Sequence, residues 1–137
     1  MQIQFDHISP NKSAVEYKLT VDSNGLGKLM FYGNYKRGSE GNADGFFMEE
    51  VTSYTLSREF VKSLIVDLRE LDYSWGNTIN NTISRLLSTD MPIAVIYGNK
   101  CKSIVLSDED FFVKTEHEAL DIINKRLGLS KNLSTPS

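Results

Sequence analysis

The stretch from Ser57 to Leu106 constrains the fold most, because it is rich in aliphatic residues and holds the only Trp of the chain. Removal of apolar side chains from water is the dominant favourable term in folding, and such residues are mostly buried. We therefore expect this stretch to form the core, with the earlier part of the chain packed against it.

The size and composition of the chain indicate one globular domain. Of its 137 residues, 40% are hydrophobic and 24% are charged, which is ordinary for a domain that folds without disulfide bonds. We place the domain at residues 1–129 and interpret residues 130–137 as a polar C-terminal tail. The single cysteine excludes an intramolecular disulfide and a cysteine-rich metal site.

Charge and hydropathy narrow the choice of partners. The formal net charge is −3 and the basic residues are scattered, which argues against binding to a nucleic-acid backbone. The sequence has no run of about 18 apolar residues and no secretion signal. We therefore expect a cytoplasmic protein that binds neither nucleic acid nor a membrane.

The first third of the sequence predicts a β-hairpin. Residues 15–21 alternate between apolar and polar side chains, as in a half-buried strand. Residues 23–27 supply the Asn and Gly that suit a tight turn, and residues 28–35 return as the partner strand. A further short strand is expected within residues 2–7.

The middle of the chain is harder to interpret. Residues 37–45 contain three glycines and predict a flexible loop, and residues 51–56 look like a third strand of the N-terminal sheet. Between Ser57 and Leu71, apolar residues recur at helical spacing behind a possible Ser57 cap, which favours a helix. Residues 64–68 also suit a buried parallel strand, so this alternative stays open.

The second half predicts two helices and two strands. Residues 77–87 form an amphipathic pattern, residues 92–97 a buried strand after Pro92, and residues 101–106 its hairpin partner. The apolar face of the first helix consists of Ile79, Ile83, Leu86 and Leu87.

A last helix follows a capping box made by Thr115 and Glu118, and we expect it to end at Gly128. Together these elements predict an α+β or mixed α/β fold. Its single mixed or antiparallel sheet has about five to six strands, with two to three helices packed on it.

The turn before residue 77 is the best candidate for a binding site. Tyr73 and Trp75 lie close together there, and such aromatic residues often anchor protein interfaces. We predict a partner-binding surface that consists of Tyr73, Trp75, Asn77, Asn80, Asn81 and Ser84. The alternative is that Trp75 only fills one end of the core.

No catalytic, metal-binding or cofactor-binding constellation is found in the sequence. Cys101 is most simply a packing residue at the start of a strand. A small enzyme would have to use pocket carboxylates such as Asp67 or Asp72, and we favour this hypothesis least.

Residues 64–83, with the sequence LIVDLRELDYSWGNTINNTI, resemble the central segment of STAS domains, the fold of anti-sigma-factor antagonists. That family has a buried strand, an Asp-containing stretch, and then a Ser or Thr and a Gly at the start of a helix. The resemblance implies a switch in which phosphorylation of the Ser or Thr controls partner binding. Ser74 and Gly76 are the nearest equivalents, although the Asp-Ser-Ser-Gly run is missing.

We expect a non-enzymatic module that binds another protein and needs no cofactor. By analogy with other small acidic domains, the leading hypothesis is an immunity or antitoxin protein that neutralises a toxin domain. The alternative is a STAS-like regulatory protein that is controlled by partner binding or by phosphorylation.

Overall fold

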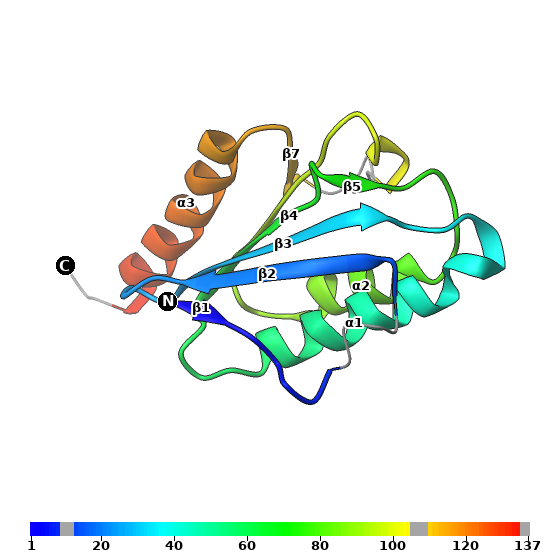
Figure 1. Cartoon of the computed structure of the whole chain (residues 1–137). Coiled ribbons are helices and arrows are strands. Elements are labelled where there is room, and N and C mark those ends of the chain that lie inside the picture. The colour runs from blue at the N-terminus through cyan, green and yellow to red at the C-terminus, as the bar shows by residue number, and fades with distance from the viewer. Residues whose placement is uncertain (9–12, 105–109, 135–137) are drawn as a thin grey trace.

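The computed structural model describes residues 1–8, 13–104 and 110–134, and it shows one mixed sheet with helices on both faces (Figure 1). The strands are β1 (Gln2–Ile3), β2 (Val15–Val21), β3 (Leu26–Asn34), β4 (Ser63–Asp67), β5 (Leu71–Asp72), β6 (Ile93–Ile96) and β7 (Phe112–Val113). The helices are η2 (Gly38–Gly41), α1 (Asn42–Leu56), α2 (Ile79–Ser88), η3 (Lys102–Ile104) and α3 (Glu116–Ser134), where η denotes a 3₁₀ helix.

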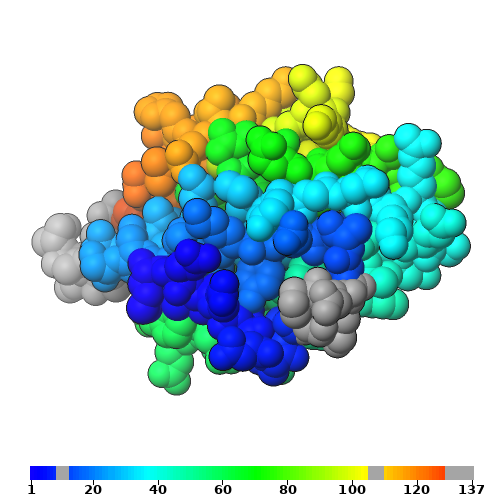
Figure 2. Space-filling view, in the orientation of Figure 1, coloured from blue at the N-terminus to red at the C-terminus, as the bar shows by residue number. Residues whose placement is uncertain are grey.

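The strand order is β1-β2-β3-β4-β6-β7, and β5 extends the sheet as a second neighbour of β3. Strands β1 to β3 pair antiparallel, whereas β3, β4, β6 and β7 run parallel. Figure 2 shows the strands β1 to β3, from dark blue to light blue, at the surface that faces the viewer. The predicted mixed sheet with helices packed on it is confirmed.

The parallel strands are buried on both faces. Leu64 and Val66 of β4 face the cluster that includes α1 and α2, whereas Ile65 faces α3 through Ala119 and Ile123. Strand β6 alternates in the same way, so both strands read as continuous apolar runs.

This double burial explains a wrong prediction. The helix favoured for residues 57–71 does not form, and the alternative strand is present as β4 (Ser63–Asp67). A continuous apolar run contains apolar residues at helical spacing as well, so periodicity alone cannot separate the two structures.

The loop predicted for residues 37–45 and the strand predicted for residues 51–56 are also wrong, because η2 and α1 occupy both segments. Asp44 holds residues 37–45 in place. Its carboxylate accepts hydrogen bonds from the Ser13 hydroxyl and from the backbone N–H groups of Ala14 and Lys36. The β-branched residues of α1 are buried at helical spacing, and this packing overrides their strand propensity. The buried residues of this helix are Asp44, Gly45, Phe47, Met48, Val51, Thr52 and Thr55.

The predicted strand at residues 101–106 is replaced by η3 as far as Ile104, and residues 105 and 106 lie outside the described residues. Cys101 is buried, and its thiol donates a hydrogen bond to the Leu68 carbonyl oxygen at 3.1 Å. The helix predicted at residues 77–87 forms as α2, but Leu87 is exposed instead of lying on the buried face.

The last helix begins as predicted, because the Thr115 hydroxyl accepts a hydrogen bond from the Glu118 backbone N–H at 3.1 Å. The helix does not end at Gly128 but continues through it to Ser134. A glycine inside a helix is tolerated at a cost of about 1 kcal/mol.

No helix within the described ranges is long and apolar enough to cross a membrane. The domain limit at residue 129 and the polar tail remain predictions.

We predict that Thr115→Ala lowers the free energy of unfolding by about 1 kcal/mol, because the helix loses its N-cap. Chemical denaturation followed by circular dichroism measures this change. Thr115→Ser is the matched control, because it keeps the capping hydroxyl and should stay close to the wild type. Equal losses in both variants would show that the hydroxyl does not cap the helix.

Candidate protein-binding site

The candidate site lies between β5 and α2, at the carboxyl ends of the parallel strands β3 and β4 (Figure 1). Two backbone hydrogen bonds fix this segment. The Tyr35 N–H donates to the Asp72 carbonyl oxygen at 2.9 Å, and the Tyr73 N–H donates to the Lys100 carbonyl oxygen at 2.9 Å. The segment is thus held by the end of β3 on one side and by the loop after β6 on the other.

Tyr73 lies beneath this surface, with 8% of its area exposed. Its ring meets the Tyr35 ring edge-on at a centroid distance of 4.9 Å, and its hydroxyl donates to the Gly76 carbonyl oxygen at 2.6 Å. Burial raises the pKa of Tyr73, and burial with the charges of Tyr73 and Asp44 raises the pKa of Tyr35 to about 12. Both phenols therefore stay neutral at physiological pH and act as packing groups.

Trp75 is the exposed aromatic of the turn, with 60% of its area accessible. The Gly38 N–H donates to the Trp75 carbonyl oxygen at 3.4 Å. The indole lies against Gly38 so closely that a Cβ atom at that position would come within 2.6 Å of the ring. Gly38 also has a φ of 60°, which favours glycine. The η2 turn therefore supports the indole while it remains accessible to a partner.

The four predicted polar residues are all exposed around the first turns of α2, namely Asn77, Asn80, Asn81 and Ser84. Thr78 is the exception on this segment, because its hydroxyl bonds to the Asn42 side chain of α1. The structure therefore exposes Trp75 and these four polar side chains within one segment of the chain and buries Tyr73 beside Tyr35.

The sequence did not predict the neighbours of this surface. A cavity of about 380 Å³ opens beside the turn. Its lining consists of Asn34, Tyr35, Lys36, Arg37, Glu40, Asp72 and Ser74. Phe46 of α1 is also exposed, between Asn42 and Glu49, whose side chains reach Thr78 and Arg85 of α2. Helical spacing of residues 42, 46 and 49 is the signal that could have found Phe46.

The carboxylates considered for catalysis lie in different surroundings. Asp72 is exposed beside Ser74 in this cavity, whereas Asp67 is buried at the end of β4. The Asp67 carboxylate accepts two hydrogen bonds from the Arg69 guanidinium, at 3.0 and 2.7 Å, and a third from the Arg69 backbone N–H at 3.1 Å. Asp67 therefore forms an ion pair with Arg69 at the carboxyl end of β4.

The ion pair predicts a pH dependence of stability. Burial alone raises the pKa of Asp67, but the hydrogen bonds and charge of Arg69 outweigh burial and hold it below the ordinary value of 3.8. A lowered pKa in the folded state stabilises the protein above pH 3.8, and this contribution is lost as the pH falls through the folded pKa. Urea denaturation of wild type and Asp67→Asn should thus differ at about pH 7, and the difference should shrink as the pH falls below 3.8. A constant difference across this range would contradict the assignment.

Among the comparisons with known proteins, the one with solved structures identifies the fold. No family model matches the sequence, and no curated protein matches it. The structure is similar to that of an anti-sigma factor antagonist from Mycobacterium paratuberculosis, with a TM-score of 0.65 and 12% identity over 85% of this chain and 98% of that chain. This chain has the anti-sigma factor antagonist fold. The antagonist SpoIIAA in its unphosphorylated form also matches, with a TM-score of 0.53 and 12% identity over 80% and 98% of the two chains.

The resemblance to STAS domains is therefore confirmed at the level of fold, and it covers most of the chain instead of residues 64–83 alone. In this antagonist fold the exposed Trp75 lies in the connection between the strand β4 and the helix α2. Ser74 and Gly76, the positions nearest to the family pattern, flank it directly. Ser74 is exposed and lines the same cavity as Lys36 and Arg37.

Proposed function

We propose that this chain is a non-enzymatic regulatory module that binds another protein at the Trp75 corner. We define the Trp75 corner as Trp75 with the exposed polar side chains Asn77, Asn80, Asn81 and Ser84. The observation that carries the proposal is the indole, 60% exposed and supported by η2 at the start of α2. The exposed part of a large ring adds no stability to the free protein, whereas its burial against a partner stabilises the complex.

The geometry of the corner suits a protein partner better than a small molecule. A rigid ring on a fixed turn supplies contact area at little cost in conformational entropy, and the amides can supply a hydrogen-bonding rim. Phe46 on α1 and the cations Lys36 and Arg37 adjoin this surface, which widens it beyond a single pocket. We expect the partner to present an apolar pocket for the indole and acidic residues for the two cations.

The similarity of fold supports one class of partner. The two similar structures are described as anti-sigma factor antagonists, and the proposed partner is a regulatory protein of the kind that such antagonists act on. The analogy with toxin-neutralising immunity proteins has no support among these comparisons, and regulation by partner binding replaces it. A phosphorylation switch would act on Ser74, which is exposed beside Lys36 and Arg37.

Site-specific cross-linking in the native host tests this proposal. A photoreactive phenylalanine analogue at position 75 should cross-link one regulatory protein, and mass spectrometry of the adduct identifies it and reads the state of Ser74. The same analogue at Phe60, which is also exposed and lies in the loop before β4, is the matched control. Recovery of the same proteins from both positions, or of none from position 75, would reject the Trp75 corner.

A further inference from the structure

A second surface lies at the outer edge of the sheet, along β2. Strand β1 pairs with β2 only at Gln2 with Thr20 and Ile3 with Leu19, and Met1 adds a hydrogen bond in each direction with Val21. Strand β2 continues to Val15 without a neighbouring strand on this side within the described part of the chain. Residues 15–18 therefore form an open sheet edge.

The backbone groups at this edge can be assigned from the hydrogen-bond pattern. Residues of an antiparallel strand point their N–H and C=O groups alternately to one neighbour and to the other. Val21 bonds to Met1, so Leu19, Tyr17 and Val15 point to the same outer side. The Val15 N–H donates to the Ser13 hydroxyl, whereas no backbone bond to the outward groups of Tyr17 is present in the described residues.

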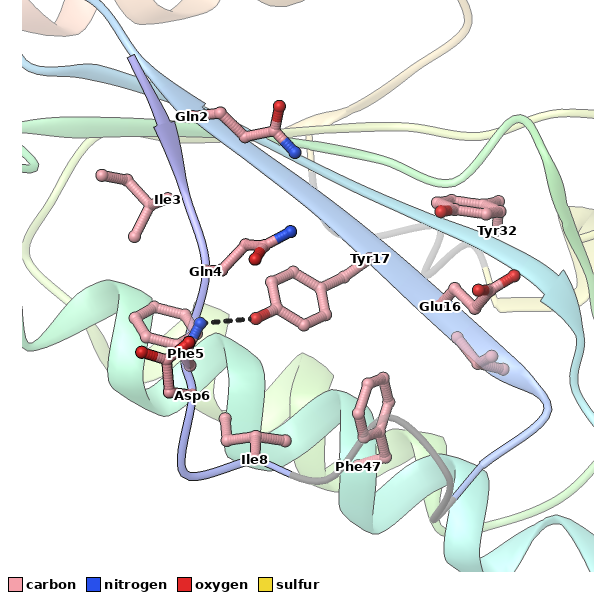
Figure 3. A pocket seen from close by; sticks show the side chains of 11 residues that line it. Gln2, Ile3, Gln4, Phe5, Asp6, Ile8, Glu16, Tyr17, Tyr32 and Phe47 are labelled. Atoms are coloured by element: carbon pink, nitrogen blue, oxygen red, sulfur yellow. Dashed lines mark hydrogen bonds between the residues drawn. The ribbon is translucent and has the colours of Figure 1, made fainter.

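The side chain of Tyr17 keeps this edge open. If the β1 ladder continued in register, Phe5 would lie opposite Tyr17. Instead, the Phe5 N–H donates to the Tyr17 hydroxyl at 2.7 Å, and the two rings stack at a centroid distance of 6.0 Å. Figure 3 shows the Tyr17 ring reaching from β2 toward Phe5. One ring therefore separates the segment that follows β1 from β2.

The result is a groove of about 350 Å³ between this segment and β2. Apolar side chains line it, including Phe5, Ile8 and Phe47, and Figure 3 shows Phe47 reaching it from α1. Among the described residues, the charged side chains that line the groove are Asp6 and Glu16, whereas Lys18, at the other end of this edge, is exposed and does not line it. A single extended chain with a cationic side chain matches this combination of backbone, apolar and acidic groups.

We propose that the β2 edge at residues 15–18 binds an extended basic segment of a partner protein as an added strand. A second copy of this chain does not suit the groove, because its own β2 edge carries the segment after β1 and cannot enter as a single strand. This surface is separate from the Trp75 corner, so either site can fail its test without the other.

Hydrogen exchange with a defined peptide tests the proposal. The probe is a capped Lys-Val-Thr-Val-Lys peptide added to the ¹⁵N-labelled protein. In the free protein the Tyr17 amide should exchange rapidly, and saturating peptide should slow it about tenfold or more. The same peptide with alternate amides N-methylated keeps its charge but cannot complete the strand pairing, and it should give no protection.

Charge and self-association are tested in the same assay. Glu16→Lys should weaken peptide binding about tenfold, whereas Asp121→Lys, the same charge change on an exposed residue of α3, should not. Equal binding of the N-methylated peptide, or of a peptide with Glu in place of Lys, would overturn the proposal. So would a Tyr17 amide already protected in the free protein, or protected only as protein concentration rises, which would indicate a second copy.

Discussion

Replacing Tyr73 by alanine should lower the free energy of unfolding by about 3–5 kcal/mol, the usual cost of removing a buried aromatic ring. The ring fills the space beside Tyr35, and its hydroxyl holds the Gly76 carbonyl oxygen. The variant therefore leaves a cavity and also frees the turn that carries Trp75. Urea denaturation followed by far-UV circular dichroism measures the loss.

Tyr73→Phe is the matched control, because it keeps the ring and removes only the hydrogen bond to Gly76. Its expected cost is about 1 kcal/mol, the net value of one such bond. If Tyr73→Ala were as stable as Tyr73→Phe, the ring would contribute nothing to the core, and Tyr73 would return to the list of partner-binding candidates.

The different positions of Tyr73 and Trp75 show where sequence information ends. Both rings lie in one turn of four residues, and the sequence treats them alike. The alternation that begins in β5 buries Leu71 and Tyr73 and exposes Asp72 and Ser74, but it breaks at Trp75, whose exposed ring lies against Gly38. Strand β5 forms by pairing with β3, which lies far from it in the sequence. A pairing over this distance leaves no local pattern from which the strand could be predicted. The exposure of the polar face of α2, by contrast, follows from helical periodicity and was predicted from sequence.

The same reasoning explains the elements that were wrong. The hairpin of β2 and β3 was predictable because its alternation and its turn are both local. Helix α1 was not, because its start depends on Asp44, which bonds to Ser13, Ala14 and Lys36 across the fold. The groove at β2 depends on the Tyr17 hydroxyl replacing a ladder bond, and a strand pattern cannot show which partner a hydroxyl will take.

Trp75→Ala should weaken binding to the cross-linked partner by about 2 kcal/mol or more, the loss typical of an interface anchor. This corresponds to roughly thirtyfold in the dissociation constant at about 1.4 kcal/mol per decade. The physical reason is the loss of contact area with the partner. The indole projects from a turn that Gly38 supports, and the methyl group of alanine is too small to replace it. Isothermal titration calorimetry with the purified partner gives the affinity.

Stability measured on the same variant distinguishes this from a structural role. Since most of the indole is exposed, Trp75→Ala should change the free energy of unfolding by less than about 1 kcal/mol, far below the about 3–5 kcal/mol expected for a core ring. Phe60→Ala removes another exposed ring away from α2 and should leave affinity unchanged. A folded Trp75→Ala variant that binds with normal affinity would eliminate the Trp75 corner as the binding site. A large loss of stability would instead show that the indole belongs to the core.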